Sequence, residues 1–206
     1  MPELRVSLVA ACGRMPAHTQ ELCLMDTGIG DGDHGLTAER GFLAAQKALE
    51  AYTGTEDAGL FSAMGEAMAR SMGGAIGPLY GVYWRAFSKA LNGESLRGEN
   101  LGLALGAGCD QVMRLGRAVL GDKTVVDAMH PCALAASSGQ GDLAARLNLA
   151  AEGARSGALA TKEMTAKKGR ARFLGGQSAG HVDAGAYSFA LFMGHWAEQI
   201  SLAKEV

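Results

Sequence analysis

The sequence contains few cysteines, and their spacing excludes the sites that need two of them close together. Four occur in 206 residues, at Cys12, Cys23, Cys109 and Cys132. No pair has the Cys-x-x-Cys spacing that is typical of a zinc site or a dithiol redox centre. Because free cysteine is among the most often buried residue types, we expect buried free thiols.

Long apolar runs and an excess of positive charge are also missing. The first residues are interrupted by Pro2, Glu3 and Arg5, so they lack the apolar segment of a signal peptide. No run approaches the ~20 apolar residues that a membrane-spanning helix requires. The formal net charge of −2 argues against nucleic acid, whose phosphates are held by clustered Lys and Arg. We therefore expect a cytoplasmic protein with no membrane and no nucleic acid partner.

Strand-like alternation of Val, Ile and Thr is absent, whereas helical periodicity is strong. Apolar residues recur at helical spacing in two stripes that we expect to face the core, namely Leu60, Met64, Met68 and Met72, and Phe189, Phe192, Met193, Trp196 and Ile200. Breaks rich in glycine separate about eight helical stretches, predicted at residues 3–24, 35–52, 57–72, 78–91, 99–117, 123–136, 141–166 and 185–203. The sequence predicts an all-α fold.

The connections between these stretches are short, which favours antiparallel neighbours. We therefore predict an up-and-down antiparallel bundle or barrel of about eight helices. No shift in composition marks a boundary, so residues 1–206 are predicted to form a single domain.

The segment with the strongest chemical signal is Asp26-Thr27-Gly28-Ile29-Gly30-Asp31-Gly32-Asp33-His34-Gly35. Three Asp side chains that lie close together repel one another unless a cation neutralises them. Ligands that are all oxygen suit Mg²⁺, which also takes waters and substrate phosphates. Glycine lets the backbone approach a ligand closely. The sequence predicts a metal and phosphate site formed by Asp26, Asp31 and Asp33.

Two alternatives were considered for this loop. An EF-hand calcium loop fails on spacing, because the twelfth position counted from Asp31 is Phe42, which cannot ligate a cation. A helix cap with solvated charge is the usual reading of one Asp-Gly pair, but it does not explain three aspartates and four glycines. His34 can contact a phosphate, orient a carboxylate or cap the following helix, and the sequence does not choose among these. The helix start at Gly35, Leu36 and Thr37 adds an anion site.

Two further segments can contact a ligand. The run of small residues from Gly73 to Gly81 lies between two helical stretches and admits a flat or phosphorylated ligand, although close helix packing also selects such residues. The run from Lys167 to Arg172 carries four basic side chains, and a long polar excursion with four glycines follows it up to Gly185. Arg supplies fork donors for phosphate, and long ordered loops are more often functional than incidental.

Four motifs together resemble the nucleotide-binding L subunit, or L domain, of dihydroxyacetone kinases. They are Gly30-Asp31-Gly32-Asp33-His34-Gly35, Gly73-Gly74-Ala75 with Gly77-Pro78-Leu79, Gly121-Asp122-Lys123-Thr124, and Lys168-Gly169-Arg170-Ala171 leading to Gly180-His181-Val182-Asp183. The likeness runs from about Leu22 to Ala190.

The resemblance implies an eight-helix antiparallel barrel that holds ADP or ATP at one end through two Mg²⁺ ions. By this likeness Asp26, Asp31 and Asp33 match metal-binding positions. The positions that match nucleotide-contacting ones are His34, Gly35, Leu36, Thr37, Ala75, Ile76, Gly116, Val125, Arg170, Asp183, Ala184 and Gly185. The chain departs from the family pattern at three of them, where Thr37 replaces Asn, Ile76 replaces Ser and Ala184 replaces Pro.

The function that the resemblance implies is phosphoryl transfer from a Mg²⁺-bound nucleotide to a short ketose, which is held by a separate K subunit. In the phosphoenolpyruvate-dependent systems of this family, an M subunit of the phosphotransferase type rephosphorylates the bound ADP. An ATP-dependent kinase of a ketose such as erythrulose is an alternative. A fatty-acid kinase type is ranked low, because it carries further domains. An alternative of another class is a non-catalytic nucleotide-binding regulator whose partner is a transcription factor.

Overall fold

The computed structural model describes residues 2–203, and every regular element in that range is helical. The α-helices are α1 (Pro2–Arg14), α2 (Thr19–Thr27), α3 (His34–Ala51), α4 (Asp57–Ser71), α5 (Ile76–Ala90), α6 (Gly98–Gly116), α7 (Val126–Ser138), α8 (Leu143–Ala160) and α9 (Ala184–Leu202). Three 3₁₀ segments join them, namely η1 (Met15–His18), η2 (Thr161–Glu163) and η3 (Ala171–Ser178). The predicted all-α class is confirmed.

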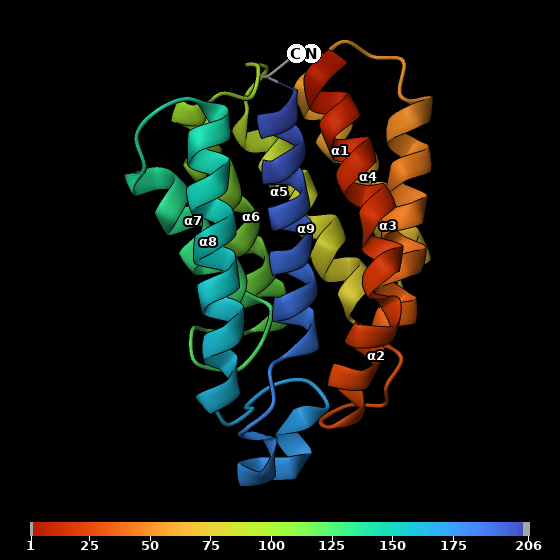
Figure 1. The fold of residues 1–206 in the computed structure, drawn as a ribbon, viewed down its shortest axis with the longest axis vertical. Coiled ribbons are helices and arrows are strands. Elements are labelled where there is room, and N and C mark those ends of the chain that lie inside the picture. Colours follow the sequence, from red (N-terminus) through yellow and green to blue (C-terminus); the bar gives the residue numbers. More distant parts are fainter. Residues whose placement is uncertain (1, 204–206) are drawn as a thin grey trace.

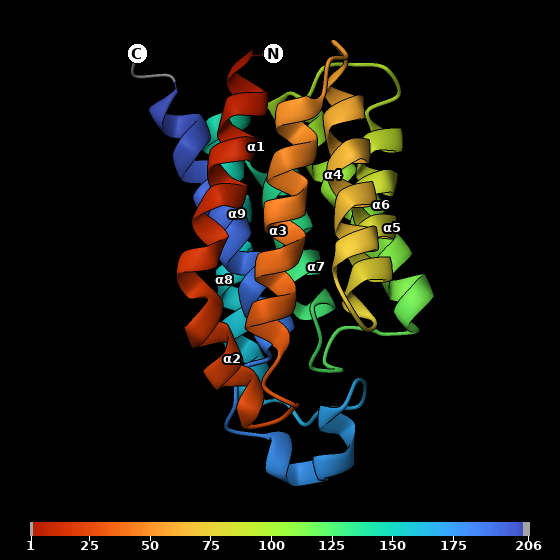
Figure 2. The ribbon, with the colours of Figure 1, turned by 90° about the vertical axis from the view of Figure 1, so that its right-hand side faces the viewer.

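The long helices form a closed ring in which the chain direction alternates (Figures 1 and 2). From α3 to α9, each helix packs against the next one along the chain, and α1 contacts both α3 and α9. The short helix α2 continues beyond α1 and packs on α3. Among the residues described, no helix has both the length and the apolar character needed to cross a membrane.

Because the direction alternates, the connections that lead into α3, α5, α7 and α9 lie together at one end of the ring. Residues 28–33, 72–75, 117–125 and 161–183 all lie at the lower end in Figure 1, where α3, α5, α7 and α9 begin. The start of α1 and the finish of α9 lie at the opposite end. The four segments with the predicted motifs, which are far apart in the sequence, therefore meet at one end.

Aromatic side chains fill the interior of the ring. Phe61 and Phe87 have ring centroids 4.3 Å apart, and Trp84 lies edge-on to Phe192 at 5.7 Å. Trp196 contacts this group from α9. All residues of the two apolar stripes predicted from the sequence are buried, so both predictions are confirmed. Burial of one large side chain contributes about 1.5–3 kcal/mol, which makes this cluster a main source of stability.

Three of the four cysteines are buried free thiols, as predicted, and Cys23 is half-buried. Burial raises the pKa of the Cys109 thiol to about 12 and also raises the pKa of Cys132. These thiols therefore stay protonated at neutral pH and act as small apolar groups.

Two predicted helix ranges were wrong. The range 3–24 is two helices, because Pro16 lies in η1 between them and has no N–H to donate to a preceding turn. The range 141–166 ends six residues early, at Ala160. Beyond it, the Thr161 hydroxyl donates to the Ala158 carbonyl at 2.5 Å and the chain turns into η2.

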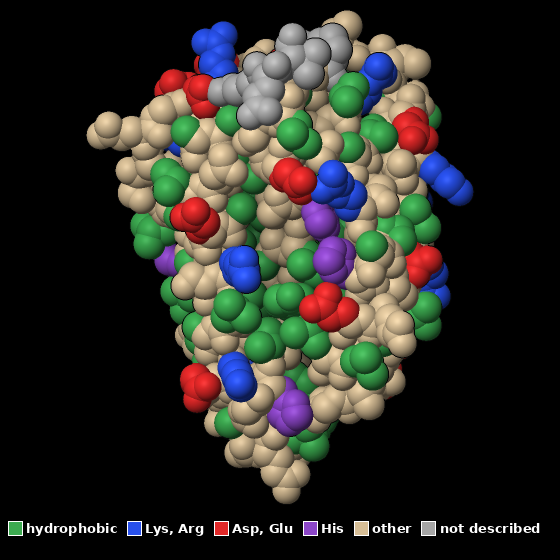
Figure 3. All heavy atoms as spheres, in the orientation of Figure 1, with side chains coloured by type: hydrophobic (Ala, Val, Ile, Leu, Met, Phe, Trp, Pro, Cys, Tyr) green, Lys and Arg blue, Asp and Glu red, His purple; other side chains and the backbone are tan. Residues whose placement is uncertain are grey.

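A pair of histidines joins η1 to α9. His18 Nε2 and His195 Nε2 are 3.0 Å apart, so one proton is shared between them, and Glu21 accepts from His18 Nδ1 at 3.1 Å. Figure 3 shows two histidines next to each other among acidic and basic side chains on the face that includes α9. Burial lowers the pKa of His195, and His18 and Arg14 lower it further against the effect of Glu198.

This pair predicts a loss of stability in acid. Because the folded state lowers the pKa of His195 below its unfolded value of about 6.5, the unfolded state binds the proton more readily, and stability falls as pH drops through that range. Between pH 7.5 and 5.5, His195→Gln should therefore lose less stability than wild type. Urea unfolding at both pH values measures it, with exposed His130→Gln as the matched control. An unchanged pH dependence in His195→Gln would contradict this account.

Candidate functional site

The four gathered connections surround a cavity of about 410 Å³. We call residues 26–33 the aspartate loop. The polar wall of the cavity comes from this loop, the start of α3 and residues 168–171, and its apolar wall includes Leu79, Val112 and Val126. A cavity of this size and mixed lining lies within the range of small-molecule sites.

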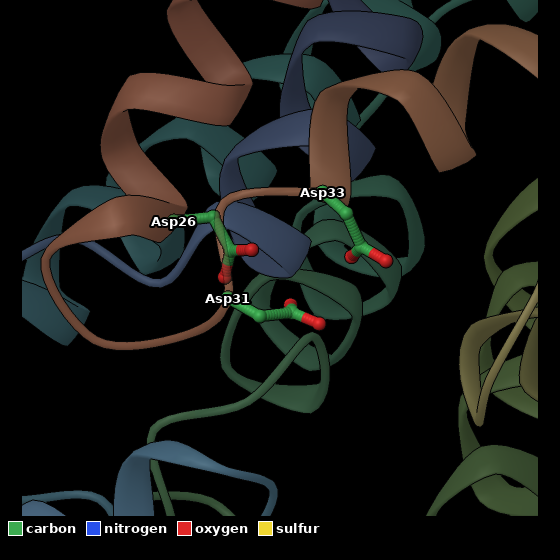
Figure 4. A group of neighbouring side chains, drawn as sticks. All are labelled: Asp26, Asp31 and Asp33. Carbon is green, nitrogen blue, oxygen red and sulfur yellow. The ribbon is translucent and has the colours of Figure 1, made fainter.

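The three aspartates face a common space at the mouth of this cavity (Figure 4). Asp26 extends from the last turn of α2, and Asp31 and Asp33 come from the loop that leads into α3. One carboxylate oxygen from each of them lies within 4.8 Å of the others. Among the described residues, this is the one group of three or more acidic, His or Cys side chains that is close enough to share a metal ion.

The loop is built around the Asp26 carboxylate. Asp26 Oδ2 accepts from the backbone N–H of Gly32 at 2.9 Å and from that of His34 at 3.3 Å. A Cβ on Gly30 would collide with the Asp26 side chain, and Gly32 has a φ of 76°. The glycines are therefore required for the loop to fold back over this carboxylate.

A basic group from the last connection reaches the triad. Arg170 forms an ion pair with Asp31, and both side chains are about half exposed. Nearby, Ile29 of the aspartate loop clusters with Ala166 and Ala171 of the excursion 161–183, away from the main core. These contacts hold the excursion against the aspartate loop. The single positive charge of Arg170 only partly balances the three negative carboxylates. A hard cation fits the remaining charge and the all-oxygen donor set.

His34 is fixed at the first turn of α3. Its Nε2 lies 2.9 Å from the hydroxyl oxygen of Ser188, which in turn donates to the Gly185 carbonyl at 3.0 Å. Burial lowers the pKa of His34, and this outweighs the attraction of Asp26 for a proton. Because the Ser188 hydroxyl donates to Gly185, Nε2 of the neutral imidazole donates to Ser188, and Nδ1 is left to accept one hydrogen bond from a ligand at the start of α3.

Asp183 caps the opposite wall of the site. Its Oδ2 accepts from the Ala186 N–H at 2.8 Å, which begins α9. Burial raises the pKa of Asp183 to about 6, although that hydrogen bond and the nearby ammonium of Lys123 favour the charged form. Burial thus makes negative charge unfavourable at Asp183.

Thirteen of the fifteen residues predicted from the sequence line the cavity, namely Asp26, Asp31, Asp33, His34, Thr37, Ala75, Ile76, Gly116, Val125, Arg170, Asp183, Ala184 and Gly185. The other two lie outside its lining. A Cβ on Gly35 would collide with the Thr19 carbonyl oxygen, so Gly35 lets α3 pack closely on α2. Leu36 is 55% exposed on the outer side of α3.

Sequence reasoning missed two basic residues in the lining, Arg40 and Lys123. Arg40 donates to the Thr37 hydroxyl at 3.0 Å, one turn away on α3. The spacing of Asp33, Thr37 and Arg40 at four and three residues was a usable signal, because it places them on one helix face. Lys123 belongs to the Gly121-Asp122-Lys123-Thr124 motif, but the neighbouring residues in the sequence do not indicate that its side chain is buried.

Comparisons with known proteins match most of the chain to one family. Residues 28–198 match the DAK2 domain. The ADP-binding subunit DhaL of the PEP-dependent dihydroxyacetone kinase of Escherichia coli (strain K12) is 36% identical over 193 residues, which cover 91% of this chain and 92% of that protein. The corresponding subunit of kinase 1 of Listeria innocua serovar 6a is 36% identical over 178 residues, 86% of each chain.

Longer relatives match over part of their length. The L-erythrulose kinase of Pectobacterium atrosepticum is 37% identical over 195 residues, which cover 91% of this chain but 33% of that protein. The crystal structure of the dihydroxyacetone kinase of C. freundii with AMP-PNP and Mg²⁺ superposes with a TM-score of 0.76 at 24% identity, over 96% of this chain and 34% of that one. At this identity the superposition shows the fold alone. The chain therefore belongs to the DAK2 domain family, as the resemblance of its motifs to the L subunits of dihydroxyacetone kinases predicted.

Proposed function

We propose that this chain is the nucleotide-binding subunit of a dihydroxyacetone kinase that holds Mg²⁺-bound ADP or ATP. In the ATP form it presents the γ-phosphoryl group to a ketose on a K subunit, and ADP is left on the chain. The observation that carries the proposal is the aspartate triad at the mouth of a cavity closed on one side by Arg170. Relatives of similar length are named as ADP-binding subunits of PEP-dependent kinases, which favours rephosphorylation by an M subunit of the phosphotransferase type.

The metal would be held by Asp26, Asp31 and Asp33. When bound, Mg²⁺ neutralises phosphate charge and so favours phosphoryl transfer. The chain prepares the three carboxylates for this role in different ways. The backbone N–H groups of Gly32 and His34 occupy one oxygen of Asp26 and leave the other directed at the triad. Asp31 and Asp33 are the more exposed pair and keep their oxygens available to an ion.

The remaining residues suit the parts of a nucleotide. The start of α3 offers backbone N–H groups and the positive end of an 18-residue helix to phosphate, beside Arg40 and Arg170. The apolar wall from α5, α6 and α7, with Leu79, Val112 and Val126, suits a flat base. The site thus orders the ligand with its phosphates toward the open mouth, where a ketose on another polypeptide can reach them.

Replacing a triad carboxylate tests the metal assignment. Asp33→Asn, and separately Asp31→Asn, should weaken Mg²⁺-dependent ADP binding at least about 100-fold, because each removes one anionic ligand of three. Isothermal titration calorimetry with and without Mg²⁺ measures the effect, and far-UV circular dichroism checks that the helices persist. Asp110→Asn, at an exposed position on α6, is the matched control. Wild-type ADP affinity in both triad variants would rule out the metal assignment.

A reconstituted assay tests the kinase role. The chain is mixed with a K subunit, and phosphorylation of dihydroxyacetone or erythrulose is followed with either ATP or a phosphorylated M subunit as donor. Transfer from the M subunit with sub-stoichiometric ADP is expected, because the nucleotide then acts as a retained cofactor. Transfer only with excess ATP would favour the ATP-dependent alternative. If ADP binds but neither donor supports transfer, the non-catalytic regulator becomes the better account.

A further inference from the structure

Lys123 is a buried cation at the base of the site. Its side chain is among the largest fully buried ones, with 2% of the residue exposed. The ammonium donates to the Thr161 carbonyl at 2.5 Å and to the His181 carbonyl. Burial lowers the pKa of Lys123, whereas Asp183 and Asp127 favour its charged form. A buried ammonium is costly unless it is paired and hydrogen-bonded, so this one is held by specific contacts.

The two carbonyls that Lys123 binds stand at the two ends of one segment. Between Thr161 and His181 the chain leaves the barrel, forms η3 and returns to start α9. We call residues 162–180 the flap and its two ends the neck. Two more hydrogen bonds cross the neck, from Gly180 N–H to the Lys162 carbonyl at 2.7 Å and from Asp183 N–H to the Thr161 hydroxyl at 2.9 Å.

The turn that carries Lys123 is itself fixed. The Asp127 carboxylate accepts from the N–H of Gly121 at 2.6 Å and from that of Thr124 at 2.7 Å. Lys123 has a φ of 60°, a left-handed conformation that non-glycine residues seldom adopt. The Asp122 carbonyl also accepts from the Lys167 N–H of the flap at 3.1 Å. The barrel therefore holds the ammonium in a defined place against the neck.

The flap brings Arg170 to the aspartate triad. Arg170 pairs with Asp31, and Ala171 packs with Ile29. Elsewhere the flap is largely exposed, and Phe173 has 79% of its surface accessible. Contacts of this kind are weak one by one, because the median exposed ion pair contributes about 0–1 kcal/mol. The position of the flap must therefore be set mainly at its neck.

We propose that Lys123 is a positioning residue that clamps the neck of the flap, keeps Arg170 over the aspartate triad and thereby slows the release of bound nucleotide. The part about nucleotide release rests on the proposed function. The part about the clamp does not, since it concerns the protein without ligand. The two parts can therefore be tested separately.

The first test uses the protein without nucleotide. Lys123→Met keeps the length of the side chain and removes its donors. Limited trypsin digestion should cut this variant at Lys167, Lys168, Arg170 or Arg172 about tenfold faster than wild type, because the neck opens. Lys47→Met, at an exposed lysine on α3 outside the flap and its neck, is the matched control and should be cut at the wild-type rate. Lys123→Arg, which keeps donors and charge, should restore part of the protection.

The second test measures release of a fluorescent ADP analogue with Mg²⁺ by stopped flow. The dissociation rate should rise about tenfold in Lys123→Met and stay unchanged in Lys47→Met. If wild type binds no ADP, the proposed function fails while the trypsin result still decides the clamp. Wild-type cleavage and wild-type release in Lys123→Met would overturn the inference. If that variant does not fold, Lys123→Gln takes its place, because its shorter and uncharged side chain weakens both bonds to the neck, and wild-type behaviour of Lys123→Gln in both assays would overturn the inference equally.

Discussion

Repulsion among Asp26, Asp31 and Asp33 is the constraint on which the rest of the site depends. For two unit charges less than 5 Å apart, the repulsion is about 1 kcal/mol in water and about 4 kcal/mol at the lower effective dielectric of a protein surface. With carboxylate oxygens within 4.8 Å of one another, three such pairs occur here. The loop keeps this arrangement because backbone N–H groups and Arg170 offset part of the repulsion. The helices at both ends of the loop are also anchored in the core.

The barrel makes this arrangement possible through its topology. Every second connection of an alternating ring lies at the same end, so four segments spread over more than 150 residues meet there without long linkers. The helices that carry them are fixed by large buried side chains such as Trp84 and Trp196. Because stability comes from that core, the connections can keep glycines, like charges and left-handed residues that would weaken a less firmly held chain.

The sequence was sufficient for what depends on local pattern. Helical spacing of Met64 and Met68 gave the core face of α4, and acidic residues among glycines indicated the triad. It was insufficient where distant residues decide the outcome. Lys123 can be buried because carbonyls 38 and 58 residues away accept hydrogen bonds from its ammonium, and no local signal reports this. Gly35 had been assigned to a ligand, but its lack of a Cβ also serves the packing of α3 on α2.

Arg170 connects the two halves of the site. Its guanidinium pairs with Asp31, which is one of the groups that the proposed function assigns to a metal. A metal ion at Asp31 would replace this pair, and a bound phosphate would offer Arg170 new anionic partners in the same place. The flap can thus keep its position while the guanidinium changes partner, provided that its neck stays closed. For this reason a buried lysine that never needs to touch the nucleotide can govern how long the nucleotide stays.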